Sequence, residues 1–307
     1  MSADLRPAVR AWFDGAVREW DTERYLDQTY VGRARHALRW LRRLGPGKRV
    51  LDLGCGTGRQ SVAAIRAGDR VVSADFAYEM ARATRDRIVR ECPGTAPAVV
   101  VADAMHSPFR PGAFDAVMAL GVVGFVPDAP AMLRETAGVL RPGGTLVCDV
   151  GVPERRVLFH ALGGALDRPL LALRRLWRQG VRRLPPEPRA KAQGWYGAHF
   201  TKHGPERIEA MLRDAGLTPE ARGGSGFGEL RLLGRPVLPW RMAQALTKVL
   251  NRLAGTRGGG WLAGRALTCV VRSVRAPAPD PSASPRRAVL SALELADAPA
   301  VGRQLRG

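Results

Sequence analysis

A glycine-rich turn beside carboxylates is the part of the sequence best suited to chemistry. The run Val50-Leu51-Asp52-Leu53-Gly54-Cys55-Gly56-Thr57-Gly58 passes from an apolar strand pattern into a helical one. Glycines at such a turn let the backbone approach a ligand and expose amide groups at the helix N-terminus. A dinucleotide-binding turn would need glycine at Arg59, and a P-loop would need Gly-Lys-Ser/Thr, so the observed Gly-x-Gly-x-Gly spacing fits neither phosphate site.

Two more aspartates follow the next two strand patterns. Asp75 ends the second, where a carboxylate can accept hydrogen bonds from both hydroxyls of a ribose. Asp103 follows the third, where a carboxylate and the neighbouring amide of Ala104 can pair with the donor and acceptor edge of adenine. These residues predict a site for adenosine without a pyrophosphate.

The elements that must position these residues alternate between strand-length apolar runs and helical periodicity from Arg49 to Val150, which predicts βαβ units and a parallel sheet. Five strands, each apolar enough to be buried on both faces, are expected at 50–53, 70–74, 98–101, 114–119 and 145–149. Helices are expected at 60–67, 78–91 and 129–140, the last stopped by a turn at Arg141-Pro142-Gly143-Gly144. Flanking helices are expected at 8–20, 33–44, 206–215 and 242–253, and further strands at 217–221 and 265–272.

In order and spacing, these motifs resemble those of class I S-adenosylmethionine-dependent methyltransferases (the EC 2.1.1 class). The residues that carry the resemblance are Leu51–Gly58, Asp75, Asp103, Phe114–Val117 and Leu140–Leu146, and the match spans Arg49 to Val150. Within the superfamily the chain is similar to the ubiquinone and menaquinone biosynthesis type. The resemblance implies an α/β fold, a Rossmann-like, doubly wound, seven-stranded and mostly parallel sheet whose last strand, here Ala266–Arg272, is antiparallel.

The resemblance also implies contacts with S-adenosyl-L-methionine. The methionine part would be wrapped by Gly54, Gly56 and Gly58, with Cys55 as a small buried loop residue and Asp52 orienting the amino end. The nucleoside part would be held by Asp75 at the ribose, Phe76 and Met80 at an adenine face, Asp103 and Ala104 at the adenine edge, and Leu120 at the pocket floor. Phe76 and Met80 lie about one helical turn apart, a spacing that is also typical of core packing.

The expected organisation is a methyltransferase domain over 1–275, followed by a disordered tail over 276–307 that is rich in Pro, Ala and Ser. The domain comprises N-terminal helices (1–47), the cofactor-binding core (48–150), a helical substrate-cap insertion (153–204) and a C-terminal part of the core (205–275).

The insertion contains a strongly basic stretch at 155–184, with eight arginines, one acidic residue and apolar residues at helical spacing. A basic amphipathic helix of this kind can be a lid packed on its own active site, which we favour, or a peripheral contact with anionic lipid. The run 237–253 is again apolar with Arg and Lys and shares both interpretations.

A general base is expected just before the helix at 206–215, in the run Trp195–His203. We favour His199 over His203, and expect Trp195 and Tyr196 to shape the acceptor pocket. His106 and His160 are interpreted as surface or packing residues. No cluster of Cys and His has the spacing of a metal site, so no metal is expected.

The formal charge of +20 would attract phosphates, but the basic residues are 44 arginines against four lysines, a skew that a GC-rich genome produces by itself. The four dispersed cysteines, and the absence of an apolar leader or spanning run, predict a reduced, cytoplasmic protein.

The leading hypothesis is therefore a methyltransferase acting on a small-molecule or lipid-like acceptor, such as a quinone precursor or a secondary metabolite. An RNA methyltransferase is one alternative. Nucleic acid is not expected as a partner, because no RNA-binding module is present and Ala119–Gly124 replaces the Asn/Asp-Pro-Pro-Tyr/Phe motif of base-amine methylation. A non-catalytic, cofactor-binding module is the other alternative. The acceptor atom and the oligomeric state stay open.

Overall fold

The computed structural model describes residues 6–22, 28–153, 156–159, 161–162, 165–166, 200–227, 231–232, 235–256 and 258–276. These residues belong to one compact unit, 1–276. The expected tail at 276–307 lies outside the described residues except for Ala276, and so does most of the insertion expected at 153–204.

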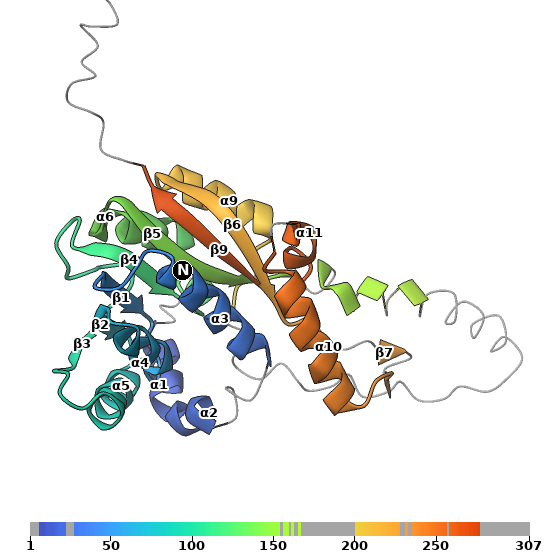
Figure 1. The fold of residues 1–307 in the computed structure, drawn as a ribbon, viewed down its shortest axis with the longest axis horizontal. Coiled ribbons are helices and arrows are strands. Elements are labelled where there is room, and N and C mark those ends of the chain that lie inside the picture. Colours follow the sequence, from blue (N-terminus) through green and yellow to red (C-terminus); the bar gives the residue numbers. More distant parts are fainter. Residues whose placement is uncertain are drawn as a thin grey trace, which may run out of the picture. The chain divides into compact units, whose positions relative to one another are not determined.

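A seven-stranded sheet in the order β3-β2-β1-β4-β5-β9-β6 organises this unit (Figure 1). The sheet strands are β1 (Arg49–Leu53), β2 (Arg70–Asp75), β3 (Ala98–Val101), β4 (Phe114–Ala119), β5 (Leu140–Gly151), β6 (Leu217–Ser225) and β9 (Thr268–Arg275). The first five are parallel, whereas β9 runs antiparallel to both β5 and β6. The expected mostly parallel sheet with an antiparallel last strand is confirmed. A separate two-stranded hairpin pairs β7 (Arg231–Leu232) with β8 (Arg235–Pro236).

Helices cover both faces of the sheet (Figure 1). The described helices are α1 (Arg6–Gly15), α2 (Val17–Thr22), α3 (Gln28–Arg42), α4 (Arg59–Arg66), α5 (Tyr78–Glu91), α6 (Ala129–Val139), α9 (Pro205–Asp214), α10 (Trp240–Leu253) and α11 (Gly260–Ala263). On one face α3 and α4 pack on alternate residues of β1 and β4, and α5 packs on α4, β2 and β3. On the other face, α6 and α9 enclose the larger apolar cluster.

The expectation that every strand is buried on both faces is wrong for β3. Val100 and Val101 remain 36% and 42% exposed, because β3 is the edge of the sheet and pairs only with β2. An edge strand lacks the second neighbour that would cover it.

Several boundaries also differ from the sequence-based expectation. The helix expected over 8–20 divides into α1 and α2 after Gly15, a residue with low helix propensity. The turn expected at 141–144 is part of β5, whose register against β4 shifts between Phe114 and Ala116. β6 continues to Ser225, paired with β9 along this stretch. Gly223 within it lies against the His36 ring, where a Cβ would come within 2.8 Å, so this glycine allows close packing.

Candidate functional site

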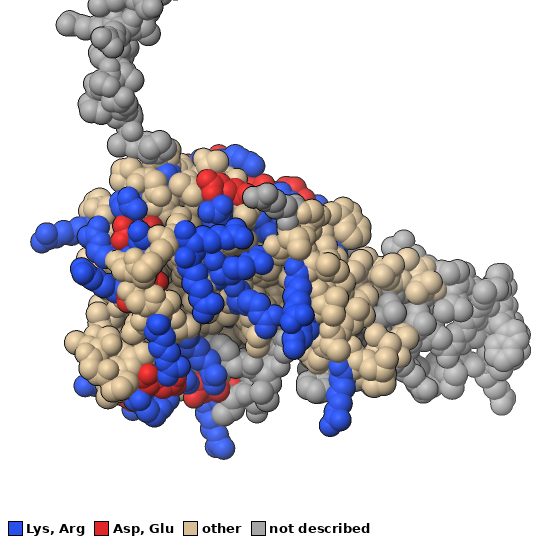
Figure 2. All heavy atoms as spheres, viewed as in Figure 1, with Lys and Arg blue, Asp and Glu red and all other residues tan. Residues whose placement is uncertain are grey.

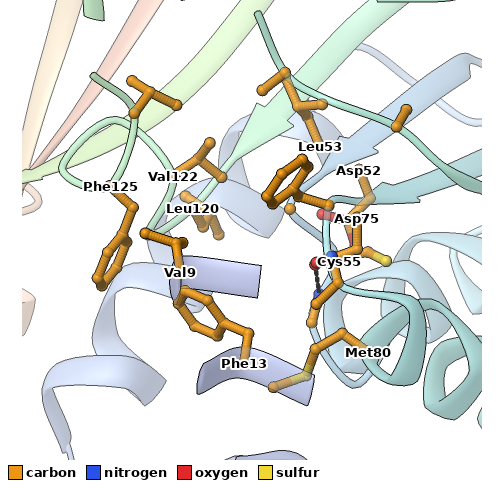
Figure 3. Close-up of a pocket in the computed structure, with 18 of the residues that line it drawn as sticks. Val9, Phe13, Asp52, Leu53, Cys55, Asp75, Met80, Leu120, Val122 and Phe125 are labelled. Atoms are coloured by element: carbon orange, nitrogen blue, oxygen red, sulfur yellow. Dashed lines mark hydrogen bonds between the residues drawn. The ribbon is translucent and has the colours of Figure 1, made fainter. Parts of the chain in front are cut away.

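The carboxyl ends of β1, β2, β3 and β4 meet at one edge of the sheet, and a pocket of about 410 Å³ opens there (Figure 3). In open α/β sheets ligands bind at this edge. Of the cofactor-binding residues predicted from the sequence, all but one line the pocket: Asp52, Gly54, Cys55, Gly56, Asp75, Phe76, Met80, Asp103, Ala104 and Leu120.

Gly58 is the exception. It begins α4 with a φ of +79°, and a Cβ there would come within 2.9 to 3.0 Å of Thr84. The glycine lets the loop pack closely against α5, so its position supports the turn without lining the pocket. Gly54 (φ +71°) lies against Val122, where a Cβ would come within 2.3 Å, whereas Gly56 (φ +56°) leaves open space.

Asp75 joins the end of β2 to the glycine loop. Its Oδ2 accepts a hydrogen bond from the amide of Gly56 at 2.8 Å and its Oδ1 from the amide of Ala77 at 2.9 Å. Each oxygen keeps a further lone pair for a ligand hydroxyl. Burial raises the pKa of Asp75 to about 6, although these two amides oppose the rise.

Asp52 lies beneath the same loop and is 2% exposed. Its Oδ2 accepts from the Ser61 hydroxyl at 2.6 Å, and Ser61 in turn accepts from Ser73 at 2.8 Å. Burial raises the pKa of Asp52 to about 6, and the nearby charge of Asp75 adds to the rise while Ser61 opposes it. Neither carboxylate forms an ion pair with a basic residue of the described ranges, so both are complementary to a cationic ligand.

Cys55 is 3% exposed between these two carboxylates. Burial raises the pKa of its thiol well above the ordinary value, and the charges of Asp75 and Asp52 act in the same direction. A protonated thiol is a poor nucleophile. The geometry agrees with the expected role as a small buried loop residue.

At the third strand end, Asp103 accepts from the Met105 amide at 2.9 Å, and its other oxygen lies 3.4 Å from His106 Nδ1 and 3.7 Å from Arg6. The side chain of His106 is 72% exposed, in agreement with the expected surface role. Ala104 is buried beside Asp103, so the side-chain carboxylate and the backbone edge expected for adenine are both at the pocket.

The far wall of the pocket was not anticipated from the sequence. It comes from α1, α2 and the loop after β4, through Val9, Phe13, Trp20, Phe125 and Val126. Figure 3 shows Val9, Phe13 and Phe125 on this side of the pocket. The ring of Phe13 stacks on Trp20 with centroids 6.1 Å apart and meets Phe125 edge-on at 5.1 Å. Met80 packs into this cluster and also lines the pocket, so the expected core packing is present while its contact with adenine stays a prediction. In the sequence, the amphipathic pattern of the first helix was the feature that could have indicated this wall.

Arg33 was likewise not predicted from the sequence as a residue of the site. Its side chain, 9% exposed, lines the pocket and forms an ion pair of 3.1 Å with Asp149 of β5. Asp149 also accepts from the Gly121 amide, and the guanidinium lies 4.5 Å from the ring centre of Tyr30. A buried cation is thereby fixed at the edge of the apolar wall.

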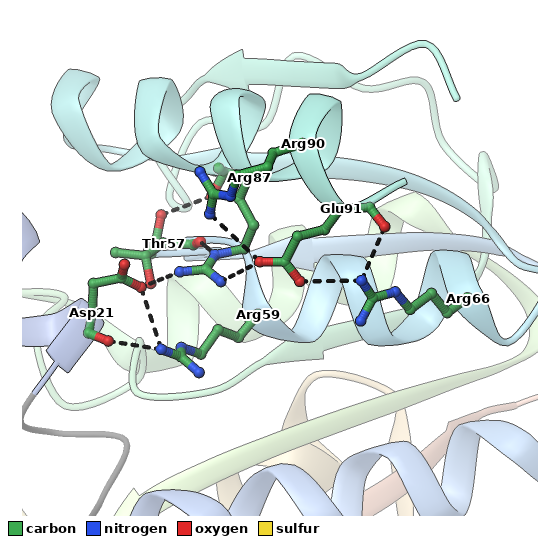
Figure 4. Close-up of polar contacts among 9 residues, drawn as sticks. Asp21, Thr57, Arg59, Arg66, Arg87, Arg90 and Glu91 are labelled. Atoms are coloured by element: carbon green, nitrogen blue, oxygen red, sulfur yellow. Dashed lines mark hydrogen bonds and ion pairs between the residues drawn. The ribbon is translucent and has the colours of Figure 1, made fainter. Parts of the chain in front are cut away.

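A polar network ties α2 to the glycine loop (Figure 4). Arg87 of α5 donates to the Thr57 carbonyl at 2.6 Å and forms ion pairs with Glu91 at 2.6 Å and with Asp21 of α2. Arg59 donates to the Asp21 carbonyl at 2.7 Å. Asp21 follows Trp20 in the chain, so these bonds connect the aromatic wall to the glycine loop.

The site fits S-adenosylmethionine. Two carboxylates, one buried (Asp52) and one partly buried (Asp75), form no ion pair within the described ranges and suit its cationic groups and hydroxyls, and Gly56 leaves open space beside them. The Thr57 hydroxyl, 2% exposed and lining the pocket, has no hydrogen-bond partner among the described residues. A buried polar atom of this kind is normally satisfied by a ligand or water.

The predicted base His199 lies outside the described residues, as do Trp195, Tyr196 and His160. Thr201, two residues after His199, lines the pocket. His203 is buried and does not line it; burial, with Arg207 nearby, lowers the pKa of His203. Within the described ranges no three His, Cys, Asp or Glu side chains gather as a metal site would require.

Residues 51–148 match the family model of a methyltransferase domain. A demethylmenaquinone methyltransferase of Mycobacterium marinum is 38% identical over 147 residues, which cover 47% of this chain and 60% of that relative. One of Mycobacterium tuberculosis is 36% identical over 164 residues, which cover 53% of this chain and 67% of the relative. The alignments therefore span about two thirds or less of these relatives' lengths.

Solved structures share the fold. A magnesium protoporphyrin IX methyltransferase from Synechocystis with bound S-adenosylmethionine has a TM-score of 0.54 at 17% identity, covering 90% of this chain and 99% of that one. A putative methyltransferase of Haloferax volcanii, in complex with a methyltransferase activator, has a TM-score of 0.54 at 20% identity, covering 86% and 97%.

Proposed function

The chain belongs to the class I S-adenosylmethionine-dependent methyltransferases, and we propose that it methylates a small, largely apolar acceptor held between α1, α2 and the loop after β4. The observation that carries the proposal is the division of the pocket into two halves. Carboxylates and glycine backbone form one half, and Val9, Phe13 and Phe125 form the other (Figure 3). Trp20, stacked on Phe13, belongs to the second half. The relatives are named demethylmenaquinone methyltransferases, and a flat quinone-type acceptor suits the aromatic wall.

The residues that would hold S-adenosylmethionine are those predicted from the sequence. Asp75 would take the ribose hydroxyls, Asp52 and the backbone at Gly54 and Gly56 the methionine part, and Asp103 the adenine edge. When bound, the cofactor supplies a methyl carbon attached to a cationic sulfur. The residues of this chain orient that group and exclude water from it, and alignment of this kind lowers a barrier by up to about 7 to 11 kcal/mol.

On the acceptor side, Arg33 is the residue suited to hold an oxygen. A fixed, buried guanidinium stabilises an anionic oxygen beside it, which lowers the pKa of an acceptor hydroxyl and makes it a better nucleophile. The ion pair with Asp149 keeps the guanidinium in place. His199, whose side chain is not described, remains the predicted base.

Two finer expectations stay proposals. Cytoplasmic residence is one, and peripheral membrane contact through 155–184 is the other, since most of that stretch is outside the described residues. No helix in the described ranges is both long and apolar enough to cross a bilayer.

Cofactor binding is tested by calorimetry with S-adenosylmethionine and S-adenosylhomocysteine. Replacing Asp75 by Ala should weaken binding about 10- to 100-fold, because hydrogen bonds to a charged group contribute roughly 1.5 to 3 kcal/mol. Asp214→Ala, at the exposed end of α9, is the matched control. Binding that survives Asp75→Ala unchanged would show that the site is assigned wrongly.

Turnover is tested separately, with a radiolabelled methyl donor and three acceptor pools: reduced quinones, total RNA and an apolar extract of cells. Label is expected in the quinone or apolar pool. Label confined to RNA would favour the nucleic-acid alternative, and tight cofactor binding with no label in any pool would favour a non-catalytic module.

A further inference from the structure

The exposed face of α10 combines an apolar stripe with a basic one. Met242, Val249 and Leu253 are 57%, 51% and 51% exposed. At about 100° per residue these three positions fall within roughly 40° of one another around the helix. Large apolar side chains gathered on one exposed stripe, rather than scattered, mark an interaction surface.

A basic stripe runs beside the apolar one. Arg241, Lys248 and Arg252 are exposed and lie roughly 100° around the helix from the apolar stripe, by the same geometry. The sequence of α10 contains no acidic residue, and none of the three basic residues forms an ion pair with an acidic residue of the described chain.

The neighbouring helix α3 extends this charge. The Arg39 guanidinium donates to the Gly255 carbonyl just beyond α10 at 2.7 Å, which fixes the two helices side by side. Arg35, Arg42 and Arg43 are exposed on α3 and the turn after it. Figure 2 shows Lys and Arg side chains gathered over α3 and along α10, with uncharged surface beyond α10.

We propose that the α3–α10 face, defined as Arg35, Arg42, Arg241, Met242, Lys248, Val249, Arg252 and Leu253, docks on an anionic phospholipid surface. Basic side chains would meet lipid phosphates while the apolar stripe enters the boundary between headgroups and acyl chains. A nucleic acid would match the charge but would leave the apolar stripe in water. A second copy of this chain would bring like charges together.

This inference does not depend on the proposed function, since lipid binding and methyl transfer are measured independently. The first experiment is flotation of the full-length protein with vesicles of phosphatidylcholine, with or without phosphatidylglycerol, at low and high salt. Flotation is expected only with the anionic vesicles and only at low salt. Folded protein that fails to float with them at low salt would overturn the proposal.

A triple variant tests the basic stripe. Replacing Arg241, Lys248 and Arg252 by Ala should lower partitioning onto anionic vesicles about 100-fold, because each basic residue near such a surface contributes roughly fivefold. The control is Arg85→Ala on α5, another exposed arginine without an ion pair in the described chain. Equal binding by the triple variant and the wild type would contradict the proposal.

Insertion of the apolar stripe into the lipid surface can be measured separately, by fluorescence. All four native cysteines are buried, so a single introduced cysteine can be labelled with an environment-sensitive dye. The label on Val249→Cys should shift to the blue with anionic vesicles, whereas a label on Val89→Cys of α5, 56% exposed, should not. Equal shifts at both sites would rule out this face as the docking surface.

The competing occupants give distinct results. If the basic triple variant loses affinity for an RNA duplex while the wild type ignores vesicles, the face binds nucleic acid and the proposal is wrong. If Met242, Val249 and Leu253 changed together to Ser convert a dimer into a monomer, and the wild type ignores vesicles, the face is a contact between copies.

Discussion

Lowering the pH from 7 to 5 should weaken S-adenosylmethionine binding about tenfold for each of the two carboxylates, Asp52 and Asp75, that must be ionised. Both have a pKa raised to about 6, with burial as the largest cause. A group of pKa 6 is about nine-tenths ionised at pH 7 and one-tenth ionised at pH 5, which gives the tenfold factor. If both carboxylates must be charged, the loss approaches about 100-fold.

The stability of the free protein should change in the opposite direction. Because the pKa of each carboxylate is raised above the ordinary 3.8, the folded state holds its proton more tightly than the unfolded state does. This contribution is fully present below pH 3.8 and is lost as the pH rises through about 6, so these two groups make the free protein more stable at pH 5 than at pH 7. Unfolding at these groups therefore cannot explain weaker binding at pH 5.

The assay is calorimetric titration between pH 5 and 8, with circular dichroism at each pH. Asp75→Asn should bind more weakly at pH 7 and lose about one of the two tenfold steps, while Asp214→Asn should behave as the wild type. Affinity that is constant or stronger at pH 5, with the fold intact, would refute the reasoning that two ionised carboxylates hold a cationic ligand.

Three further substitutions test the walls of the pocket. Gly54→Ala should lower the free energy of unfolding in urea by about 1 to 3 kcal/mol, since its Cβ would lie 2.3 Å from Val122 at a φ of +71°. An unchanged midpoint of urea unfolding would contradict the close packing. Arg33→Met should cost about 3 to 5 kcal/mol because it leaves Asp149 buried without its partner. Adding Asp149→Asn should recover part of that loss, and no recovery would mean that the pair is not coupled. Phe13→Ala should lower turnover of an apolar acceptor at least about tenfold; the dissociation constant of S-adenosylmethionine should change less than about threefold, and a larger change would place Phe13 on the cofactor side.

The positions of the strands and the residues of the polar half of the site could be predicted from the sequence because both are local properties of the chain. Parallel strands buried on both faces are continuous apolar runs, and the three aspartates of the site lie within two residues of the ends of such runs, as Asp75 does at the end of β2. The Gly-x-Gly-x-Gly spacing is likewise a property of a few consecutive residues. β3 shows the limit, because its apolar sequence does not reveal that it is an edge strand.

The apolar half of the site depended on contacts between distant parts of the chain. Helical periodicity in the first helix indicates that one side is buried, but not against what. Phe13 meets Phe125 after more than a hundred intervening residues, and Arg33 meets Asp149 across a similar separation. Gly223 gives no sign in the sequence that the His36 ring lies against it. The sequence by itself therefore determined the residues of the polar half of the pocket, whereas only the packing of α1, α2 and α3 onto the sheet determined the apolar half, because those contacts join residues that no local pattern connects.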